Sequence, residues 1–218
     1  MMARVERFKV ATSKGDVSAA WHPANGPAIV LGHGAGAGMD HPFLVGFAEA
    51  VAAEGVSALR FNFPYLEAGR KSPDTPANAI AAFRAAFDAA VARSGGRPVF
   101  GGGKSYGGRI ASMAAAEGMP AAGLVFLGYP LHAPGKPTQV RDAHLLDLRI
   151  PMLFLQGTKD PFADPAVLAA TLRKLGDRAT YVPFEGAGHS LERSRKDDPR
   201  AAGASAAPFA VAFVREHR

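Results

Sequence analysis

The sequence predicts an α/β fold, a mostly parallel β-sheet with helices on both of its faces. Short apolar runs with strand character alternate along the chain with longer runs of helical periodicity. The strand runs are apolar at nearly every position, which is typical of parallel strands buried on both faces. The chain has 218 residues, enough for one sizeable core, and no composition shift marks a boundary. We therefore expect a single domain over residues 1–218.

The first half of the chain is expected to contain two antiparallel strands, a parallel strand, a helix, a further strand and a long helix. In that order they cover residues 5–12, 16–23, 27–34, 41–55, 57–64 and 78–96. The turn at 13–15, Ser-Lys-Gly, lies between the first two strands and is typical of a hairpin. In the first helix, Phe43, Phe47 and Val51 recur four residues apart, which is the spacing of one helical face.

The second half repeats this alternation. Strands are expected at 98–103, 121–130, 151–157 and 179–186, and helices at 109–118, 166–176 and 206–217. The low-complexity stretch 197–207, DDPRAAGASAA, is expected to be a loop before the last helix. The connection 131–150 holds 20 residues, too few for a helical cap, and its part 141–148 suits about two turns of helix.

Composition and charge exclude several classes of protein. The chain has no cysteine, so disulfides, thiolate metal sites and cysteine nucleophiles are excluded. The net charge is +6 and the pI is near 9.8, but the basic residues are scattered and the densest run, 193–200, contains its own acids. No apolar run is long enough to cross a bilayer, and the N-terminus lacks a signal-peptide pattern. We expect no nucleic-acid or membrane partner, and a cytoplasmic location.

The segment FGGGKSYGG, residues 100–108, carries two competing patterns. Its Gly-Lys-Ser matches the end of a phosphate-binding loop, and its Gly-x-Ser-x-Gly matches the turn that presents a nucleophilic serine. A phosphate-binding loop requires a glycine where this sequence has Pro98, which has no N–H to donate. That loop also follows the first strand of its sheet, whereas this strand is about the fifth. Nucleotide binding is therefore rejected.

A nucleophile elbow fits the same segment better. The serine of an elbow stands at a sharp turn from a strand into a helix, and its neighbours two residues away must be very small. Gly103 and Gly107 meet that requirement around Ser105, and Gly108 adds a third small residue. The residues before the serine have strand character and those after it have helical character. Ser105 is therefore predicted to be a nucleophile.

A serine hydroxyl needs a base to take its proton and an acid to orient that base. Asp160 follows the expected strand 151–157, and His189 follows the expected strand 179–186. The carboxyl ends of parallel strands are where such sheets place their chemistry. Asp164 is the alternative acid, but it precedes a proline and a helical run, which favours a helix cap. We therefore predict a triad of Ser105, His189 and Asp160.

An oxyanion hole is expected beside this triad. One donor is the N–H of the residue after the nucleophile, Tyr106, and the other comes from the glycine-rich loop after the strand 27–34. We predict that Ala35 supplies this second N–H, with Gly36 as the alternative. His33 in the same loop is expected to hold the shape of the loop, and Asp40 is expected to cap the following helix.

The segments LGHGAGAGMDHPFL, GGKSYGGRIAS, LQGTKDPF and GAGHSL together resemble the α/β-hydrolase superfamily, over nearly the whole chain. More narrowly, the chain resembles a lidless branch related to dienelactone hydrolases, which includes testis-expressed protein 30 and NSL-complex subunit 3 type proteins. The superfamily resemblance implies an α/β-hydrolase fold, here without a cap domain, and an ester, thioester or amide substrate.

The sequence thus predicts a serine hydrolase that acts on small or short-chain acyl substrates and needs no cofactor or metal. The alternative is a catalytically idle interaction module that has kept the fold, since some eukaryotic members of the branch resemble scaffold proteins. Lys104, in the variable position of the elbow, is interpreted as facing solvent rather than as lining the pocket and favouring an acidic substrate. The acyl group, the leaving group and the oligomeric state stay open.

Overall fold

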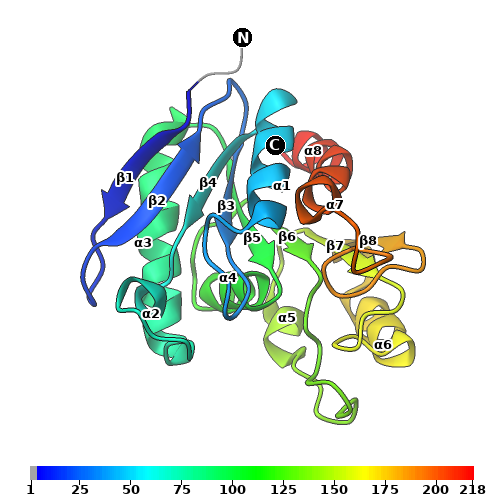
Figure 1. The fold of residues 1–218 in the computed structure, drawn as a ribbon. Coiled ribbons are helices and arrows are strands. Elements are labelled where there is room, and N and C mark those ends of the chain that lie inside the picture. The colour runs from blue at the N-terminus through cyan, green and yellow to red at the C-terminus, as the bar shows by residue number, and fades with distance from the viewer. Residues whose placement is uncertain (1–3) are drawn as a thin grey trace.

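The computed structural model describes residues 4–218, and its strands form one eight-stranded sheet (Figure 1). The order across the sheet is β1-β2-β4-β3-β5-β6-β7-β8. β1 and β2 pair antiparallel, β2 joins β4 antiparallel, and the pairs from β4 to β8 are parallel. The strands are β1 Glu6–Val10, β2 Val17–His22, β3 Ala28–Gly32, β4 Ser57–Phe61, β5 Val99–Lys104, β6 Leu124–Leu127, β7 Met152–Gly157 and β8 Ala179–Phe184.

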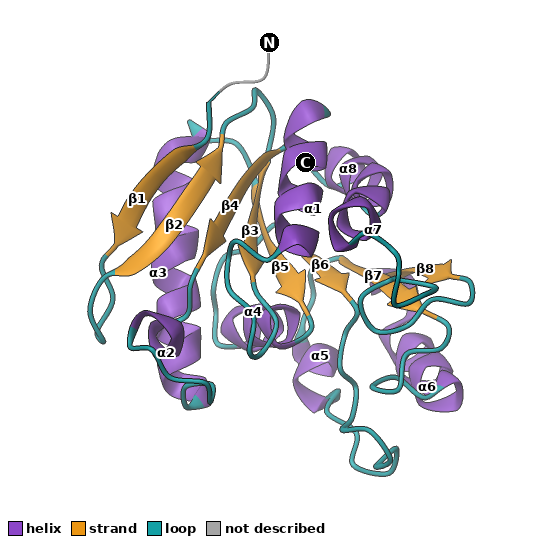
Figure 2. Cartoon of the chain, viewed as in Figure 1, coloured by secondary structure: helices purple, strands orange, loops and turns teal. Residues whose placement is uncertain are grey.

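Helices cover both faces of this sheet (Figure 2). They are α1 Pro42–Ala53, α2 Pro64–Glu67, α3 Pro76–Ser94, α4 Tyr106–Ala116, α5 Ala143–Asp147, α6 Pro165–Leu175, α7 Pro199–Ser205 and α8 Ala207–Glu216, with a 3-10 turn at Gly176–Arg178. Along β3 the buried side chains alternate between two cores, with Val30 facing the side of α3 and α4 and Leu31 facing the side of α1 and α8. This burial on both faces explains why the parallel strands are uniformly apolar.

The fold class, the hairpin and the order of strands and helices predicted from the sequence are confirmed. The expected loop at 197–207 is wrong, because residues Pro199–Ser205 form α7. Asp198 caps this helix by accepting a hydrogen bond from the Arg200 N–H, and Pro199 occupies its first position. Gly203 lies so close to the Phe43 backbone in α1 that a Cβ would overlap it. Tertiary contact with α1 therefore stabilises a helix in a sequence of low complexity.

No cap domain covers the sheet in the described part of the chain. The connection between β6 and β7 contains only α5, a helix of five residues. It lies within 141–148, where the sequence favoured about two turns of helix, but it is shorter, at little more than one turn. Among residues 4–218, no helix is long and apolar enough to cross a membrane.

The carboxyl ends of β3, β5, β7 and β8 meet at one edge of the sheet, because these four strands run parallel. Every residue that the sequence predicts to be catalytic lies in a loop or turn at this edge. The fold thus gathers segments that are far apart along the chain into one place.

Candidate active site

Ser105 stands at the apex of a strained turn between β5 and α4. Its φ of 50° and ψ of −113° are rare for a residue with a side chain and cost about 1–3 kcal/mol. Gly103 and Gly107 on either side pack directly against the backbone of Gly32 in β3, and a Cβ on either glycine would overlap that backbone. The strain is therefore held by close contact between the turn and the neighbouring strand, and it presents the serine hydroxyl at the edge of the sheet.

A continuous hydrogen-bond chain links the three residues predicted to form the triad. Ser105 Oγ lies 2.8 Å from His189 Nε2, and His189 Nδ1 lies 2.7 Å from Asp160 Oδ2. These partners assign the tautomer in which Nδ1–H donates to the carboxylate and Nε2 accepts from the hydroxyl. Asp164, the alternative acid, instead caps α6 by accepting from the N–H groups of Ala166 and Val167. The structure thus brings Asp160 to the histidine and leaves Asp164 at a helix end.

Asp160 is held by groups that the sequence analysis did not single out. The Phe162 N–H donates to its Oδ1 at 2.8 Å, and the side-chain amide of Gln156 donates to its Oδ2. Gln156 is fully buried in β7, and its Oε1 accepts a hydrogen bond of 2.7 Å from the Tyr129 N–H. A glutamine in an otherwise apolar strand is the sequence signal that could have indicated that Gln156 holds Asp160, because a buried polar side chain needs a hydrogen-bond partner.

His189 is in a state that suits a base. Burial lowers its pKa below the usual range, the hydrogen bond to Asp160 opposes that shift, and the positive charge of Lys104 adds to it. The ring stacks on Phe162 with 4.3 Å between the centroids. The imidazole is therefore neutral and free to accept a proton at neutral pH.

Two backbone N–H groups beside Ser105 have no acceptor among residues 4–218. They are those of Ala35, in the loop after β3, and Tyr106, at the start of α4. The Gly36 N–H is engaged, because it donates to the Tyr65 hydroxyl at 3.2 Å. The free N–H groups are the arrangement that a developing oxyanion requires, and of the two candidates in the loop it is Ala35 whose donor is available.

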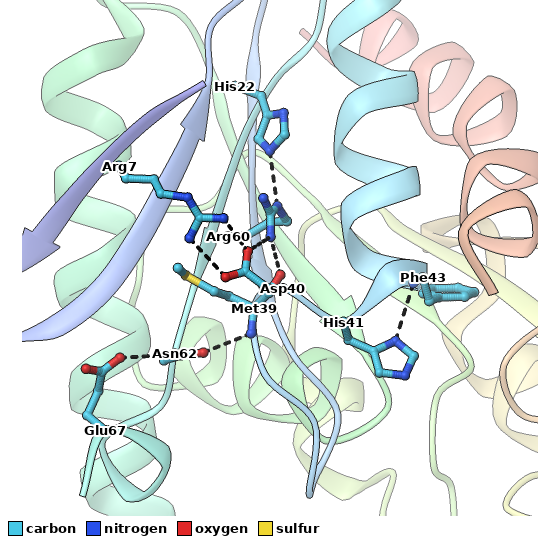
Figure 3. Close-up of polar contacts among 9 residues, drawn as sticks. All are labelled: Arg7, His22, Met39, Asp40, His41, Phe43, Arg60, Asn62 and Glu67. Atoms are coloured by element: carbon cyan, nitrogen blue, oxygen red, sulfur yellow. Dashed lines mark hydrogen bonds and ion pairs between the residues drawn. The ribbon is translucent and has the colours of Figure 1, made fainter. Parts of the chain in front are cut away.

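Buried charge anchors the far end of the loop that carries Ala35 (Figure 3). Arg60 in β4 is 2% exposed, and its guanidinium donates to the Met39 carbonyl, to Asp40 and to His22. Asp40 also pairs with Arg7 in β1, with two hydrogen bonds of 2.8 and 2.9 Å. The loop is thereby tied to β4 and to β1, which lie on either side of β2. The expectation that Asp40 caps α1 is wrong, since it serves as a bridge between two arginines.

His41 takes the capping position instead, and its Nδ1 accepts from the Phe43 N–H at 3.3 Å. On the other side of the loop, Asn62 Oδ1 accepts from the Met39 N–H at 2.8 Å, and its amide donates to Glu67 (Figure 3). The side chains of Arg60 in β4, of Asn62 just after β4 and of Glu67 in α2 therefore fix the shape of a loop that has no regular structure of its own.

His33 begins the same loop and is buried. Its Nε2 accepts from the Phe63 N–H at 3.1 Å, and its Nδ1 donates to the Gly34 carbonyl at 2.8 Å. Burial lowers the pKa of His33 to about 4, so it is neutral at physiological pH. One ring nitrogen thus bonds within the loop and the other ties the loop to Phe63 at the start of α2, which agrees with the shape-holding role expected from the sequence.

The serine opens into a pocket of about 330 Å³. Its wall is formed by the residues His33, Gly34, Ala35, Ala37, His41, Phe43, Leu44, Lys104, Ser105, Phe162, His189 and Ser190. Lys104 is half-buried in this wall, so the expectation that it faces solvent is wrong. Among residues 4–218, no group of three or more histidine or acidic side chains is arranged to hold a metal ion.

Comparison with known proteins decides the family. The family model described as "Alpha/beta hydrolase domain" matches residues 25–213. The chain belongs to this family. The match covers the glycine-rich loop, the elbow, Asp160 and His189. The pocket described above therefore lies entirely within the alpha/beta hydrolase domain.

Solved structures share the fold over nearly the full chain. A lidless α/β serine hydrolase from Xanthomonas campestris has a TM-score of 0.77 and 19% identity, and the match covers 98% of this chain and 96% of that chain. A dienelactone hydrolase from Anabaena variabilis has a TM-score of 0.76 and 18% identity, over 100% and 99%. An α/β serine hydrolase homologue from Coxiella burnetii has a TM-score of 0.73 and 17% identity, over 95% and 96%. The narrower resemblance to testis-expressed protein 30 and NSL-complex subunit 3 type proteins stays a prediction.

Proposed function

We propose that this alpha/beta hydrolase is a serine hydrolase that cleaves small or short-chain acyl esters or thioesters through an acyl-enzyme on Ser105. The observation that carries the proposal is the unbroken hydrogen-bond chain from Ser105 through His189 to Asp160, which opens into the pocket. The neutral imidazole and the strained serine support the same assignment.

In the proposed reaction, His189 Nε2 takes the proton of Ser105 as Oγ attacks the acyl carbonyl. The N–H groups of Ala35 and Tyr106 donate to the oxyanion of the tetrahedral intermediate. The imidazolium then returns its proton to the leaving oxygen or sulfur, and the bond to the leaving group breaks. Water attacks the acyl-enzyme by the same sequence, with His189 again as base. Asp160 keeps the proton on Nδ1 and stabilises the imidazolium.

The size and openness of the pocket support short acyl groups. The only helix between β6 and β7 in the described chain is α5, which is too short to roof the site. Each CH₂ group that becomes buried contributes about 0.8 kcal/mol, so a long acyl chain gains affinity only where a groove receives it. The substrate is thus proposed to be a small molecule, with no nucleic-acid or membrane partner. Cytoplasmic location remains an expectation from the sequence.

The experiment is a series of p-nitrophenyl esters from acetate to decanoate. We expect kcat/KM to peak between acetate and butyrate and to fall by octanoate, with no activation at micelle surfaces. The Ser105→Ala variant provides the background rate for each ester. A profile that rises steadily through decanoate contradicts the short-chain assignment, and wild-type protein that turns over no ester or thioester supports the alternative of an idle interaction module.

A further inference from the structure

Lys104 extends from the end of β5 along the pocket wall, next to the nucleophile. The Cγ of Lys104 lies 3.6 Å from the position that a Cβ on Gly34 would take. The stem of Lys104 therefore packs against the loop 33–41 after β3, which carries Ala35 and is called the oxyanion loop below. Its Nζ lies 3.5 Å from the corresponding position on Gly128, and His189 Nδ1 lies 3.5 Å from that same point. The ammonium group is therefore close to the triad, at the end of β6.

This ammonium has no direct partner in the described part of the chain. No carboxylate forms an ion pair with Nζ, and no acceptor in residues 4–218 receives a hydrogen bond from it. A lysine ammonium has three N–H donors, and a partly desolvated one gains most from an anionic acceptor.

The pocket lining contains no acidic residue. Besides Lys104, its titratable members are three histidines, and each is neutral at physiological pH. Burial lowers the pKa of His33 to about 4, and burial also lowers the pKa values of His41 and His189. Lys104 is therefore the group that gives this pocket its charge.

The carboxylates that face Lys104 lie behind the lining. Asp160 is engaged by His189 and Gln156, and the carboxylate of Glu192 lies next to Gly188 with its Oε2 buried and without a hydrogen bond. Burial lowers the pKa of Lys104 to about 8, and these two carboxylates oppose that shift. The lysine thus stays largely protonated at neutral pH while its open side faces the pocket.

We propose that Lys104 is a specificity-determining residue, and that the preferred substrates are short esters or thioesters with a carboxylate a few carbons from the scissile carbonyl. This inference rests on the proposed function and names the substrate class of the same pocket. Lys104 and Ser105 are adjacent and both line the pocket, so a short half-ester bound at Ser105 offers its carboxylate to an ammonium in the same pocket. A neutral ester of the same length leaves the ammonium without an acceptor.

The test compares anionic and neutral esters of matched shape. Monoethyl succinate is paired with ethyl levulinate, in which a methyl ketone replaces the carboxylate on the acyl side. Carboxymethyl butyrate is paired with acetonyl butyrate, which makes the same replacement on the leaving-group side. Hydrolysis is followed by NMR for the wild type, for Lys104→Met, and for Lys14→Met. Lys14 is an exposed lysine in the turn between β1 and β2, so its variant removes the same charge away from the pocket.

We expect the wild type to favour the anionic member of at least one pair by about tenfold or more in kcat/KM, because a charged hydrogen bond contributes about 1.5–3 kcal/mol. The preference persists in Lys14→Met and falls to about twofold or less in Lys104→Met. In the wild type it declines when the pH is raised from about 7 to about 9.5, as the ammonium loses its proton.

A wild type that favours the neutral member of both pairs, or a preference unchanged in Lys104→Met, overturns the inference. The wild-type comparison and its pH dependence hold even if the variant does not fold. Failure of the proposed function looks different, because then no ester is hydrolysed and no serine-directed probe reacts.

Discussion

The elbow and the oxyanion loop both line the pocket, but they are held in place by different means. The elbow is fixed by backbone contact, since Gly103 and Gly107 lie directly against Gly32. The oxyanion loop is fixed by polar side chains, above all the buried guanidinium of Arg60 and the amide of Asn62. One half of the site therefore depends on the absence of side chains, and the other half depends on a few particular side chains.

The loop after β7, which carries Asp160, is also fixed by polar side chains. Gln156 holds Asp160, and His132 Nε2 accepts from the Asp164 N–H at 2.7 Å at the start of α6. Such polar anchors fix a loop in one direction and leave it adjustable in others, whereas a packed backbone turn has no room to shift. We expect substitutions in the loops to lower mainly kcat, and substitutions in the elbow to lower mainly the free energy of unfolding.

The largest effect is expected at the acid. Asp160→Asn replaces the acceptor of the Nδ1 proton and favours the wrong tautomer, so kcat should fall by about 10⁴-fold. Asp164→Asn should leave kcat nearly unchanged and lower the free energy of unfolding by less than about 1 kcal/mol, because the asparagine Oδ1 can still accept the capping hydrogen bonds. Steady-state kinetics and denaturant unfolding of both variants give the comparison. The reverse ranking in kcat assigns the acid to Asp164.

The second prediction compares the elbow with the oxyanion loop directly, through the loss of stability that the same glycine-to-alanine substitution causes in each. Gly107→Ala places a Cβ onto the Gly32 backbone and should lower the free energy of unfolding by about 3 kcal/mol. Gly36→Ala meets open space and should cost only about 1 kcal/mol, for a φ of 74°. Urea unfolding monitored by circular dichroism measures both. Equal losses in the two variants mean that backbone contact does not hold the elbow.

The smallest of these effects is expected from Arg60→Met, which releases Met39 and Asp40 while the elbow stays intact. A displaced oxyanion donor acts on the transition state, so kcat should fall by about 10- to 100-fold with little change in KM. Arg7→Met is the matched control, because Arg7 holds Asp40 in an exposed pair and should change kcat by less than about twofold. A loss of stability in Arg60→Met without any loss in kcat contradicts the role of Arg60 in positioning the loop.

The difference between the two halves also explains what the sequence could predict. A turn that excludes Cβ atoms leaves a pattern of glycines around Ser105, and the sheet order places Asp160 and His189 at strand ends, so these residues could be selected from the sequence. The fold class follows from the alternation of strands and helices in the same way.

Except for Gln156, which lies four residues before Asp160, the anchors could not be predicted, because they connect segments that are far apart along the chain. Arg60 stands in a strand that reads as apolar, and its partners Met39 and Asp40 precede it by about twenty residues. The placement of Lys104 depends on how its stem packs on the loop at Gly34, which no local pattern reports. The sequence therefore located the elbow and the three residues of the hydrogen-bond chain, but not the side chains that position the loops.

The most direct test of the central claim is the intact mass of the protein after reaction with a fluorophosphonate. If Ser105 is the nucleophile activated by His189, the wild type gains the mass of one phosphonyl group, and peptide mapping places it on Ser105. Ser105→Ala, folded by circular dichroism, gains nothing. A wild-type protein that stays unmodified, or a Ser105→Ala variant that is modified at the same rate, contradicts the account.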